Sequence, residues 1–302
     1  MSRVLISDKL SPSAVDVFNS HGIDVDIKVG MTAHQLLESI DKYDGLAVRS
    51  ATNVDASLLM AGHRLRVVGR AGIGIDNINL TAATKQGILV MNTPFGNSIT
   101  TAEHTIALLL SLCRQIPKAD SSVRQGKWEK ANFMGVEVSG KVLGLVGCGN
   151  IGSIVADRAQ GLKMKVLVYD PFVTNEQALD LGVEKVNFDD LLSRSDIVSL
   201  HVPLTDITRG MIDASVMDKM RPGVRIINCA RGGLIVERDL KSAIRGGQVA
   251  GAALDVFENE PPEDPGLLEL REVIVTPHLG ASTNEAQENV AIQLAEQMSN
   301  YL

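Results

Sequence analysis

An arginine, two acids and a histidine follow short aliphatic runs in the last third of the 302-residue chain: Arg231, Asp255, Glu260 and His278. An imidazole can take up or release a proton near neutral pH, which suits the interconversion of an alcohol and a ketone. A guanidinium can hold a substrate carboxylate through two parallel hydrogen bonds. His278 is therefore a candidate acid/base and Arg231 a candidate carboxylate anchor. Glu260 is a candidate partner that would orient the imidazole ring.

Each of these residues also has a structural interpretation, which the sequence alone leaves open. Arg231 could be a surface cation and Asp255 a helix cap. Glu260 could be a solvated loop acid and His278 a structural histidine. Their shared placement after strands favours a functional role for the set, because ligands of open α/β sheets bind beyond the carboxyl ends of the strands.

A glycine-rich turn provides the clearest binding motif. The run Val142–Val146 leads into Gly147-Cys148-Gly149-Asn150-Ile151-Gly152, and Ser153–Gln160 continues with helical character. In a G-x-G-x-x-G turn the first glycine permits the tight turn, the second lets a pyrophosphate approach the backbone, and the third lets helix and strand pack closely. The alternative is a turn that only packs a strand against a helix. We predict that a dinucleotide binds at Gly147, Gly149, Asn150, Ile151 and Gly152.

Asp170 ends the next aliphatic run, roughly 20 residues beyond the glycines, where a ribose-binding acid is expected. A carboxylate at this place accepts hydrogen bonds from the ribose 2′-hydroxyl and repels a 2′-phosphate. The sequence therefore favours NAD over NADP as the cofactor. In the alternative interpretation, Asp170-Pro171 is an ordinary turn.

Short aliphatic runs alternate with amphipathic stretches along the whole chain, which is typical of βα units and a buried, mostly parallel sheet. The first third contains predicted strands at Val4–Asp8, Val25–Val29, Gly45–Arg49, Arg66–Arg70 and Leu89–Asn92. A second set is predicted at Val142–Val146, Val166–Tyr169, Ile197–Val202, Val224–Asn228, Gly251–Asp255 and Val273–Thr276. The fold class is therefore α/β, with two groups of strands.

Two predicted helices separate and close these groups of strands. Thr100-x-x-Glu103 resembles a capping box and is followed by apolar residues at helical spacing. The stretch from Asn284 onward is also predicted to be helical, and it could pack back on the first group. We therefore expect residues 1–97 and 281–302 to form one discontinuous domain, and residues 98–280 to form the other.

Composition excludes several classes of protein. The chain is 45% hydrophobic and 22% charged, which is ordinary for a globular protein, and its formal net charge of −7 lacks the basic footprint of a dedicated nucleic-acid binder. No apolar stretch approaches the roughly 18 residues that span a bilayer. The first residues become acidic too early for a signal peptide. Cys113, Cys148 and Cys229 lie far apart without C-x-x-C spacing, so we expect no disulfide framework, no metal site and a cytoplasmic location.

Several longer motifs are similar to the signatures of the D-isomer-specific 2-hydroxyacid dehydrogenases. They are Asn228–Gly233 (NCARGG), Ala253–Phe257 (ALDVF), Glu260-Pro261 and Thr276–Thr283 (TPHLGAST). The resemblance spans almost the whole chain and is far more specific than the glycine turn. It implies two doubly wound parallel-sheet domains, with a Rossmann NAD-binding domain inserted into a smaller, flavodoxin-like substrate domain.

The resemblance also implies roles for individual residues. Arg231 would hold the substrate carboxylate, Glu260 would partner His278, and His278 would be the acid/base, with Arg231 and His278 close to both cofactor and substrate. Further cofactor contacts would come from Val202, Cys229, Ala230, Asp255 (on the nicotinamide side) and Gly280. Further substrate contacts would come from Arg49, Ser50, Gly74, Asn97 and Lys130, the last reaching the phosphate site of a partner subunit.

The implied reaction is hydride transfer between NAD and C2 of a D-2-hydroxy acid. Three segments, Val48–Thr52, Arg70–Asn77 and Gly126–Glu129, are most similar to family members that oxidise 3-phospho-D-glycerate to 3-phosphohydroxypyruvate, the entry to serine synthesis. The expected ligand is a phosphorylated hydroxy acid, and the expected assembly is a homodimer or homotetramer, with no nucleic-acid or membrane partner. One departure is Ile73, which stands where close relatives often have a hydroxyl residue near the cofactor.

Two alternatives stay open at this level. The same machinery would serve a glyoxylate or hydroxypyruvate reductase, which would be indifferent to the phosphate of its substrate. An NADH-sensing binding protein similar to the dehydrogenase-like corepressors would keep the same residues without turnover, because a fold does not fix a function. The chain ends at Asn300-Tyr301-Leu302 without a glycine or proline stop signal, which leaves open whether a C-terminal regulatory domain, and with it regulation by serine, belongs to the protein.

Overall fold

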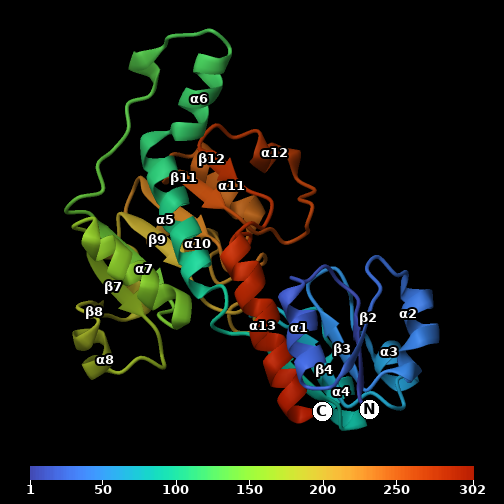
Figure 1. Ribbon diagram of the computed structural model, residues 1–302. Helices are drawn as coiled ribbons and strands as arrows, with labels where there is room; N and C mark the ends of the chain where they lie inside the picture. The colour runs from blue at the N-terminus through green and yellow to red at the C-terminus, as the bar shows by residue number, and fades with distance from the viewer. The chain divides into compact units, whose positions relative to one another are not determined.

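The computed structural model describes residues 1–302, which divide into two units (Figure 1). The first consists of Met1–Ser98 and Ala281–Leu302, and the second of Ile99–Gly280. The elements of the first unit are β1 Arg3–Ile6, α1 Ser13–Ser20, β2 Asp24–Ile27, α2 Ala33–Ser39, η1 Ile40–Lys42, β3 Gly45–Val48, α3 Ala56–Ala61, β4 Val67–Arg70, α4 Leu80–Gln86, β5 Leu89–Asn92 and α13 Asn284–Tyr301.

A five-stranded parallel sheet with the order β2-β1-β3-β4-β5 forms the centre of the first unit. This is the flavodoxin-like order, in which the connections place helices on both faces. On one face, side chains of α2, α3 and α4 pack against alternate strand residues such as Leu46 and Val68. On the other face, Phe18 of α1 and Leu294 and Met298 of α13 pack together against the sheet, so the last helix completes the core of the first unit (Figure 1).

The second unit is built on a seven-stranded sheet. Its elements are α5 Ser98–Arg114, α6 Ile116–Arg124, η2 Lys130–Asn132, β6 Val142–Val146, α7 Asn150–Gly161, β7 Lys165–Tyr169, α8 Asn175–Asp180, β8 Glu184–Lys185, α9 Phe188–Arg194, β9 Ile197–Leu200, α10 Ala214–Asp218, β10 Val224–Asn228, α11 Glu237–Arg245, β11 Val249–Leu254, α12 Pro265–Leu268 and β12 Val273–Val275. All strands are parallel, in the order β12-β11-β10-β9-β6-β7-β8. The order reverses direction between β6 and β9, as in a Rossmann fold, and ligands bind at such a switch point.

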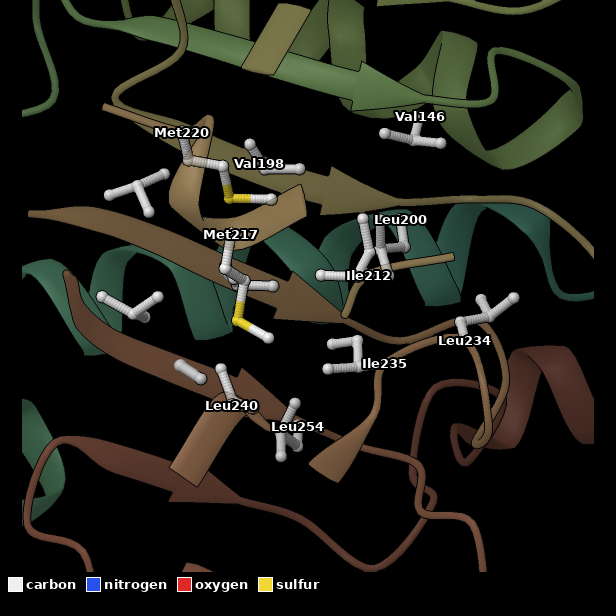
Figure 2. Packing of buried hydrophobic residues seen from close by; sticks show 14 of the residues in the cluster. Val146, Val198, Leu200, Ile212, Met217, Met220, Leu234, Ile235, Leu240 and Leu254 are labelled. Carbon is white, nitrogen blue, oxygen red and sulfur yellow. The ribbon is translucent and has the colours of Figure 1, made fainter. Parts of the chain in front are cut away.

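Neighbouring residues of one strand point to opposite faces of this sheet, and each face has its own core. α5 and α7 pack on one face. Residues of α9, α10, α11 and α12 pack on the other, where Met217 and Met220 belong to one cluster with Val198 and Leu200 (Figure 2). Because both faces are covered, the strands read as nearly continuous aliphatic runs in the sequence.

The predicted fold class of two parallel α/β units with these strand orders is confirmed. The capping-box prediction is wrong, because α5 begins at Ser98 and Thr100 lies inside its first turn. The single helix predicted between the strand sets is followed by a second one, α6, which starts after Gln115 adopts a left-handed backbone conformation. None of the helices combines the length and the apolar character needed to cross a membrane.

Candidate active site

The glycine turn lies between β6 and α7, at the switch point of the sheet. Gly147 has a φ of +94°, and a Cβ at this position would lie 2.5 Å from the carbonyl oxygen of His201, so a side chain is excluded there. A Cβ at Gly149 would meet nothing within 4 Å, so this side of the turn is open. Gly149 is the N-cap residue of α7, and the first N–H groups of a helix have no carbonyl partner within the helix, which suits an anion. The turn thus fits the pyrophosphate of a dinucleotide.

Asp170 lies beside this turn, at the end of the neighbouring strand β7. Its Oδ2 accepts a hydrogen bond from the backbone N–H of Cys148 at 2.8 Å, and its Oδ1 accepts one from the N–H of Phe172 at 2.8 Å. A carboxylate offers about four acceptor sites, so both oxygens can still accept a hydroxyl hydrogen. The geometry therefore supports Asp170 as the ribose-binding acid that favours NAD.

The thiols next to these motifs are not nucleophiles. Burial raises the pKa of Cys148, which follows the first glycine of the turn, to about 11. Burial likewise raises the pKa of Cys229, whose residue is 6% exposed, to about 12. Because a thiolate is the reactive form of cysteine, neither side chain supplies covalent chemistry near neutral pH. Cys229 offers the predicted cofactor site an apolar wall at most.

The turn that carries Arg231 packs directly against the loop that carries Glu260. A Cβ at Gly232 would lie 1.7 Å from the carbonyl oxygen of Phe257, so only glycine allows the two backbones this approach. Asn228 at the end of β10 holds the turn, since its Nδ2 donates to the Arg231 carbonyl at 2.8 Å. The Arg231 guanidinium donates to the carbonyl of Ala230 at 2.7 Å.

Glu260 and His278 are joined by a hydrogen bond with an Oε2–Nδ1 distance of 2.8 Å. The Glu260 loop is held from within, because Oε1 of Glu260 accepts the N–H of Phe257, and from α11, because Glu237 accepts the N–H of Glu258 at 2.7 Å. The His278 side chain is 47% exposed, so its ring can reach a ligand. With Nδ1 bound to the carboxylate, Nε2 is the nitrogen that can exchange a proton with a substrate.

Asp255 is fully buried at the end of β11 and anchors the loop that carries His278. Its Oδ1 accepts hydrogen bonds from Thr276 Oγ1 at 2.5 Å and from the N–H of Leu279 at 2.7 Å, and its Oδ2 accepts the N–H of Gly280 at 2.8 Å. Burial acts to raise the pKa of Asp255, but hydrogen bonds from His104, Thr276 and Leu279 outweigh it and lower the pKa below its ordinary value. Its carboxylate is therefore charged, and its role toward a cofactor stays a prediction.

The other predicted substrate residues belong to the first unit. Arg49 follows β3, and Asp8 holds its segment: Oδ2 of Asp8 accepts the N–H of Arg49 at 2.6 Å and that of Thr52 at 3.1 Å. Asn77 holds it from the other side by donating to the carbonyls of Arg49 and Thr52 at 2.7 and 2.6 Å. Burial lowers the pKa of Arg49 although Asp8 opposes this, and its Nε is buried without a hydrogen-bond partner in the protein. An unpaired buried donor of this kind suits an anionic ligand.

Gly74 and Asn97 lie on further loops of the first unit. The segment before Gly74 is fixed by Thr93, whose hydroxyl accepts the N–H of Gly72 at 2.7 Å, and by Asn92, which donates to the carbonyl of Ile73 at 2.7 Å. Asn97 is 8% exposed, whereas Ser50 is exposed. Lys130, in η2 of the second unit, is also exposed.

Within the second unit, then, the structure brings together the predicted residues Arg231, Glu260 and His278 through two touching loops and one side-chain hydrogen bond. Val202, Ala230 and Gly280 lie at or after strand ends of the same sheet. Sequence reasoning missed His104, Thr101 and Asp8, which hold the loops. The available signal was the spacing of Thr101 and His104, two polar residues three apart and therefore on one face of the predicted helix.

Comparison with known proteins decides the family. Residues 106–280, more than half of the chain, match the family model described as D-isomer specific 2-hydroxyacid dehydrogenase, NAD binding domain. The chain belongs to this family. The resemblance inferred from the sequence and the prediction of an NAD-binding unit are thereby confirmed.

Curated members of the 2-hydroxyacid dehydrogenase family are similar to the whole chain. The D-3-phosphoglycerate dehydrogenase of Archaeoglobus fulgidus is 48% identical over 299 residues, and that of Bacillus subtilis is 47% identical over 302 residues. These matches cover 99% and 100% of this chain but 57% of each relative, so the chain spans little more than half of their length.

Solved structures of family members share the fold at lower identity. A glyoxylate reductase from Paecilomyes thermophila superposes with a TM-score of 0.91 at 30% identity, covering 98% of this chain and 94% of that one. A D-lactate dehydrogenase from Aquifex aeolicus, solved with NAD and lactic acid, gives a TM-score of 0.87 at 27% identity, covering 99% and 95%. The fold is therefore common to dehydrogenases with different substrates, and the substrate has to be argued from the site.

Proposed function

We propose that this chain oxidises the C2 hydroxyl of a D-2-hydroxy acid with NAD, and that its substrate is 3-phospho-D-glycerate, which yields 3-phosphohydroxypyruvate. The observation that carries the proposal is the Glu260–His278 pair, which leaves one ring nitrogen for proton exchange in a unit with a dinucleotide turn. When bound, NAD supplies the acceptor for the hydride that leaves C2.

His278 is the proton acceptor in this proposal. Its Nδ1–H donates to Glu260, so Nε2 carries a free electron pair and takes the hydroxyl proton as the C2–O bond becomes a carbonyl. The Glu260 carboxylate then stabilises the imidazolium that forms. In the reverse direction the same Nε2 returns the proton to the carbonyl oxygen.

Arg231 holds the substrate carboxylate, and cationic side chains hold its phosphate. A planar guanidinium matches a carboxylate bidentately, which fixes C2 for transfer. Arg49, with its unpaired buried Nε, suits the phosphate in the first unit, and Lys130 is available for the phosphate bound by a partner subunit. Ser50, Gly74 and Asn97 complete the proposed substrate set. The 47–48% identity to D-3-phosphoglycerate dehydrogenases, against 30% to a glyoxylate reductase, supports the phosphorylated substrate.

A substrate panel tests the proposal. With NADH, we expect kcat/KM for 3-phosphohydroxypyruvate to exceed that for hydroxypyruvate or glyoxylate by about 100-fold, because a buried charge pair is lost without the phosphate. Equal values would instead identify a glyoxylate or hydroxypyruvate reductase. NADH binding without turnover of any 2-oxo acid would support a cofactor-sensing binding protein.

Three variants test the assigned residues. His278→Ala should lower kcat by about 100-fold or more, and Arg231→Ala should lower kcat/KM by a similar factor. Gly149→Ala should fold normally but lose NAD affinity, because its Cβ enters the space left for the pyrophosphate. His63→Ala is the matched control, since His63 is exposed in the first unit. Unchanged turnover in His278→Ala would refute the mechanism.

We also propose that the chain self-associates through α6 and the segment after it. Four large apolar side chains are exposed there: Ile116 (50%), Val123 (53%), Trp128 (84%) and Met134 (83%). Grouped exposed apolar residues commonly mark a protein interface, and a second copy would cover them. Sedimentation velocity should show a dimer or tetramer for the native chain and a monomer for Trp128→Glu. A monomeric native chain would contradict this proposal.

A reducing compartment such as the cytoplasm fits the cysteines. All three thiols, Cys113, Cys148 and Cys229, are free and buried. The family and the NAD site point the same way, and we propose a cytoplasmic enzyme on these grounds.

A further inference from the structure

We infer that His104 is a positioning residue for the acid/base His278. From α5 it fixes Asp255 and Thr276, and through them the loop that holds His278 in a strained backbone conformation. The inference rests on the proposed function for its kinetic consequence, whereas its structural content concerns the chain alone.

His278 has a φ of +54°, in the left-handed region that residues with a Cβ rarely adopt. Such a conformation persists only where the surroundings hold it, and it is common at functional sites. Here the His278 N–H donates to the carbonyl of Asp255 at 2.9 Å and to that of Thr276 at 3.0 Å. The next two N–H groups, of Leu279 and Gly280, donate to the Asp255 carboxylate. His278 and the two residues after it are therefore all hydrogen-bonded to Asp255.

The Asp255 carboxylate is itself held by α5. His104 Nε2 lies 3.2 Å from Asp255 Oδ1 and 3.2 Å from Thr276 Oγ1. A charged carboxylate only accepts hydrogen bonds, so His104 Nε2 carries a hydrogen toward it. The hydroxyl of Thr276 donates its hydrogen to Asp255, so toward His104 its Oγ1 can act only as an acceptor. His104 is thus the one side chain outside the loop and its aspartate that ties both together.

Thr101 supports the same loop from the preceding turn of α5. Its Oγ1 donates to the carbonyl of Gly280 at 3.0 Å. Residues three apart share a helix face. Thr101 and His104 therefore contact opposite ends of the segment Thr276–Gly280, Thr101 at Gly280 and His104 at Thr276. Gly280 itself packs closely against both partners, because a Cβ added there would lie 3.2 Å from Asp255 Oδ2 and 3.4 Å from Thr101 Cγ2.

Loss of the His104 imidazole should therefore loosen the loop that carries His278 and leave Arg231, the proposed substrate anchor, in place. The buried Asp255 and the partly buried Thr276 would each lose a donor, and the strained backbone of His278 could relax. A displacement of about 1 Å at a catalytic group can cost 100-fold in rate. Arg231 belongs to a different loop, so the KM of the 2-oxo acid should change little.

Hydrogen–deuterium exchange of the full chain tests the positioning role without any assay of activity. In His104→Leu, the amides of Leu279 and Gly280 should exchange at least 10-fold faster than in the native chain. His104→Gln, which keeps an N–H donor near the position of Nε2, should restore most of the protection. His63→Leu, at an exposed histidine, is the control. Unchanged exchange in His104→Leu would overturn the inference whether or not the chain is an enzyme.

Kinetics test the consequence for catalysis. We expect kcat of His104→Leu to fall 10- to 100-fold with KM changed less than threefold, and His104→Gln to recover at least half of that loss on a logarithmic scale. If kcat were unchanged and only KM rose, by a similar factor, the result would contradict a role of His104 in placing His278. If His104→Leu does not fold, Thr276→Val removes the partner hydroxyl and should give the same exchange pattern, and its failure to do so would overturn the inference.

Discussion

Two loops that carry predicted site residues are anchored by the same device in different units. Residues 49–52 follow β3 and are held by Asp8, which follows the neighbouring strand β1. Residues 276–280 follow β12 and are held by Asp255, which follows the neighbouring strand β11. In both, a buried carboxylate accepts two loop N–H groups and one threonine hydroxyl, of Thr52 and Thr276 respectively. Parallel strands bring such residues together because their carboxyl ends share one edge of the sheet.

The loops differ in what the anchor must oppose. No residue of loop 49–52 has a positive φ, and Asn77 satisfies two of its carbonyls. Loop 276–280 contains the left-handed His278, and its aspartate is completely buried and has an additional partner in His104. An anchor that only orders a loop can be simple, whereas one that maintains strain requires a fully enclosed charge with several donors.

The largest difference should appear when each carboxylate becomes an amide. Asp255→Asn should reduce the free energy of unfolding by about 3 kcal/mol, because a buried acceptor loses its charge while its donors remain. It should also reduce kcat strongly. Urea unfolding followed by circular dichroism measures the first effect. A loss below about 1 kcal/mol, within the range of neutral hydrogen bonds, would show that the charge is unimportant.

Acid should destabilise the second unit more than the first. Burial lowers the pKa of His201 to about 4 from an ordinary 6.5, whereas the three histidines of the first unit are exposed. Between these values the unfolded chain binds a proton that the folded chain does not, so stability falls as the pH falls from 6.5 to 4. We expect the free energy of unfolding to fall by about 2 kcal/mol. This is less than the pKa difference alone would give, because His201 is partly exposed to water. In His201→Gln this part of the pH profile should become flat, as denaturation midpoints would show; an unaltered profile would assign the loss to other groups.

Asp8→Asn should have a milder effect than Asp255→Asn. The Asp8 residue is 5% exposed and its loop carries no strain, so about 1–2 kcal/mol of unfolding free energy should be lost. Kinetically, KM for the phosphorylated substrate should rise while kcat is retained, since Arg49 is a proposed binding residue. Asp16→Asn, at an exposed position of α1, controls for the charge change. A fall in kcat equal to that of Asp255→Asn would remove the distinction between the loops.

The smallest effect is expected for Asn77→Ala. Two hydrogen bonds to the carbonyls of Arg49 and Thr52 disappear, but water can replace them in a partly exposed loop, so about 1 kcal/mol should be lost. Thermal unfolding measures this loss of stability, and the KM for the phosphorylated substrate should rise by a correspondingly small factor. If Asn77→Ala were more damaging than Asp8→Asn, the amide rather than the carboxylate would be the anchor of this loop.

Buried strands were predictable because both faces of each sheet are covered. The buried strands Val142–Val146 and Val224–Asn228 have the predicted bounds, and so does the less buried edge strand Leu89–Asn92. The strand Glu184–Lys185 was missed, because both residues are exposed and carry no apolar pattern. The start of α5 was misplaced because Thr100 and Glu103 have capping-box spacing, whereas the helix begins at Ser98, two residues before Thr100.

The residues of the site likewise divide into those that the sequence indicates and those that it does not. Motif residues such as Glu260 and His278 stand out locally because they belong to short segments, Glu260-Pro261 and Thr276–Thr283, that resemble family signatures. Asp8 does not, because its partners Arg49 and Thr52 lie 41 and 44 residues away along the chain. His104 sits within a helix and is joined to Asp255 across 151 residues. Only the folded sheet brings these groups together, so neither composition nor spacing indicates their function.

The position of Trp128 makes the chain a reporter of its own assembly. It is the only indole in 302 residues, and it lies 84% exposed in the segment proposed for self-association. All tryptophan emission therefore originates from this one surface, with no background from the interior of either sheet. Its emission maximum should shift to shorter wavelength as the protein concentration is raised and copies meet, which would allow the association constant to be read from a fluorescence dilution series without any label.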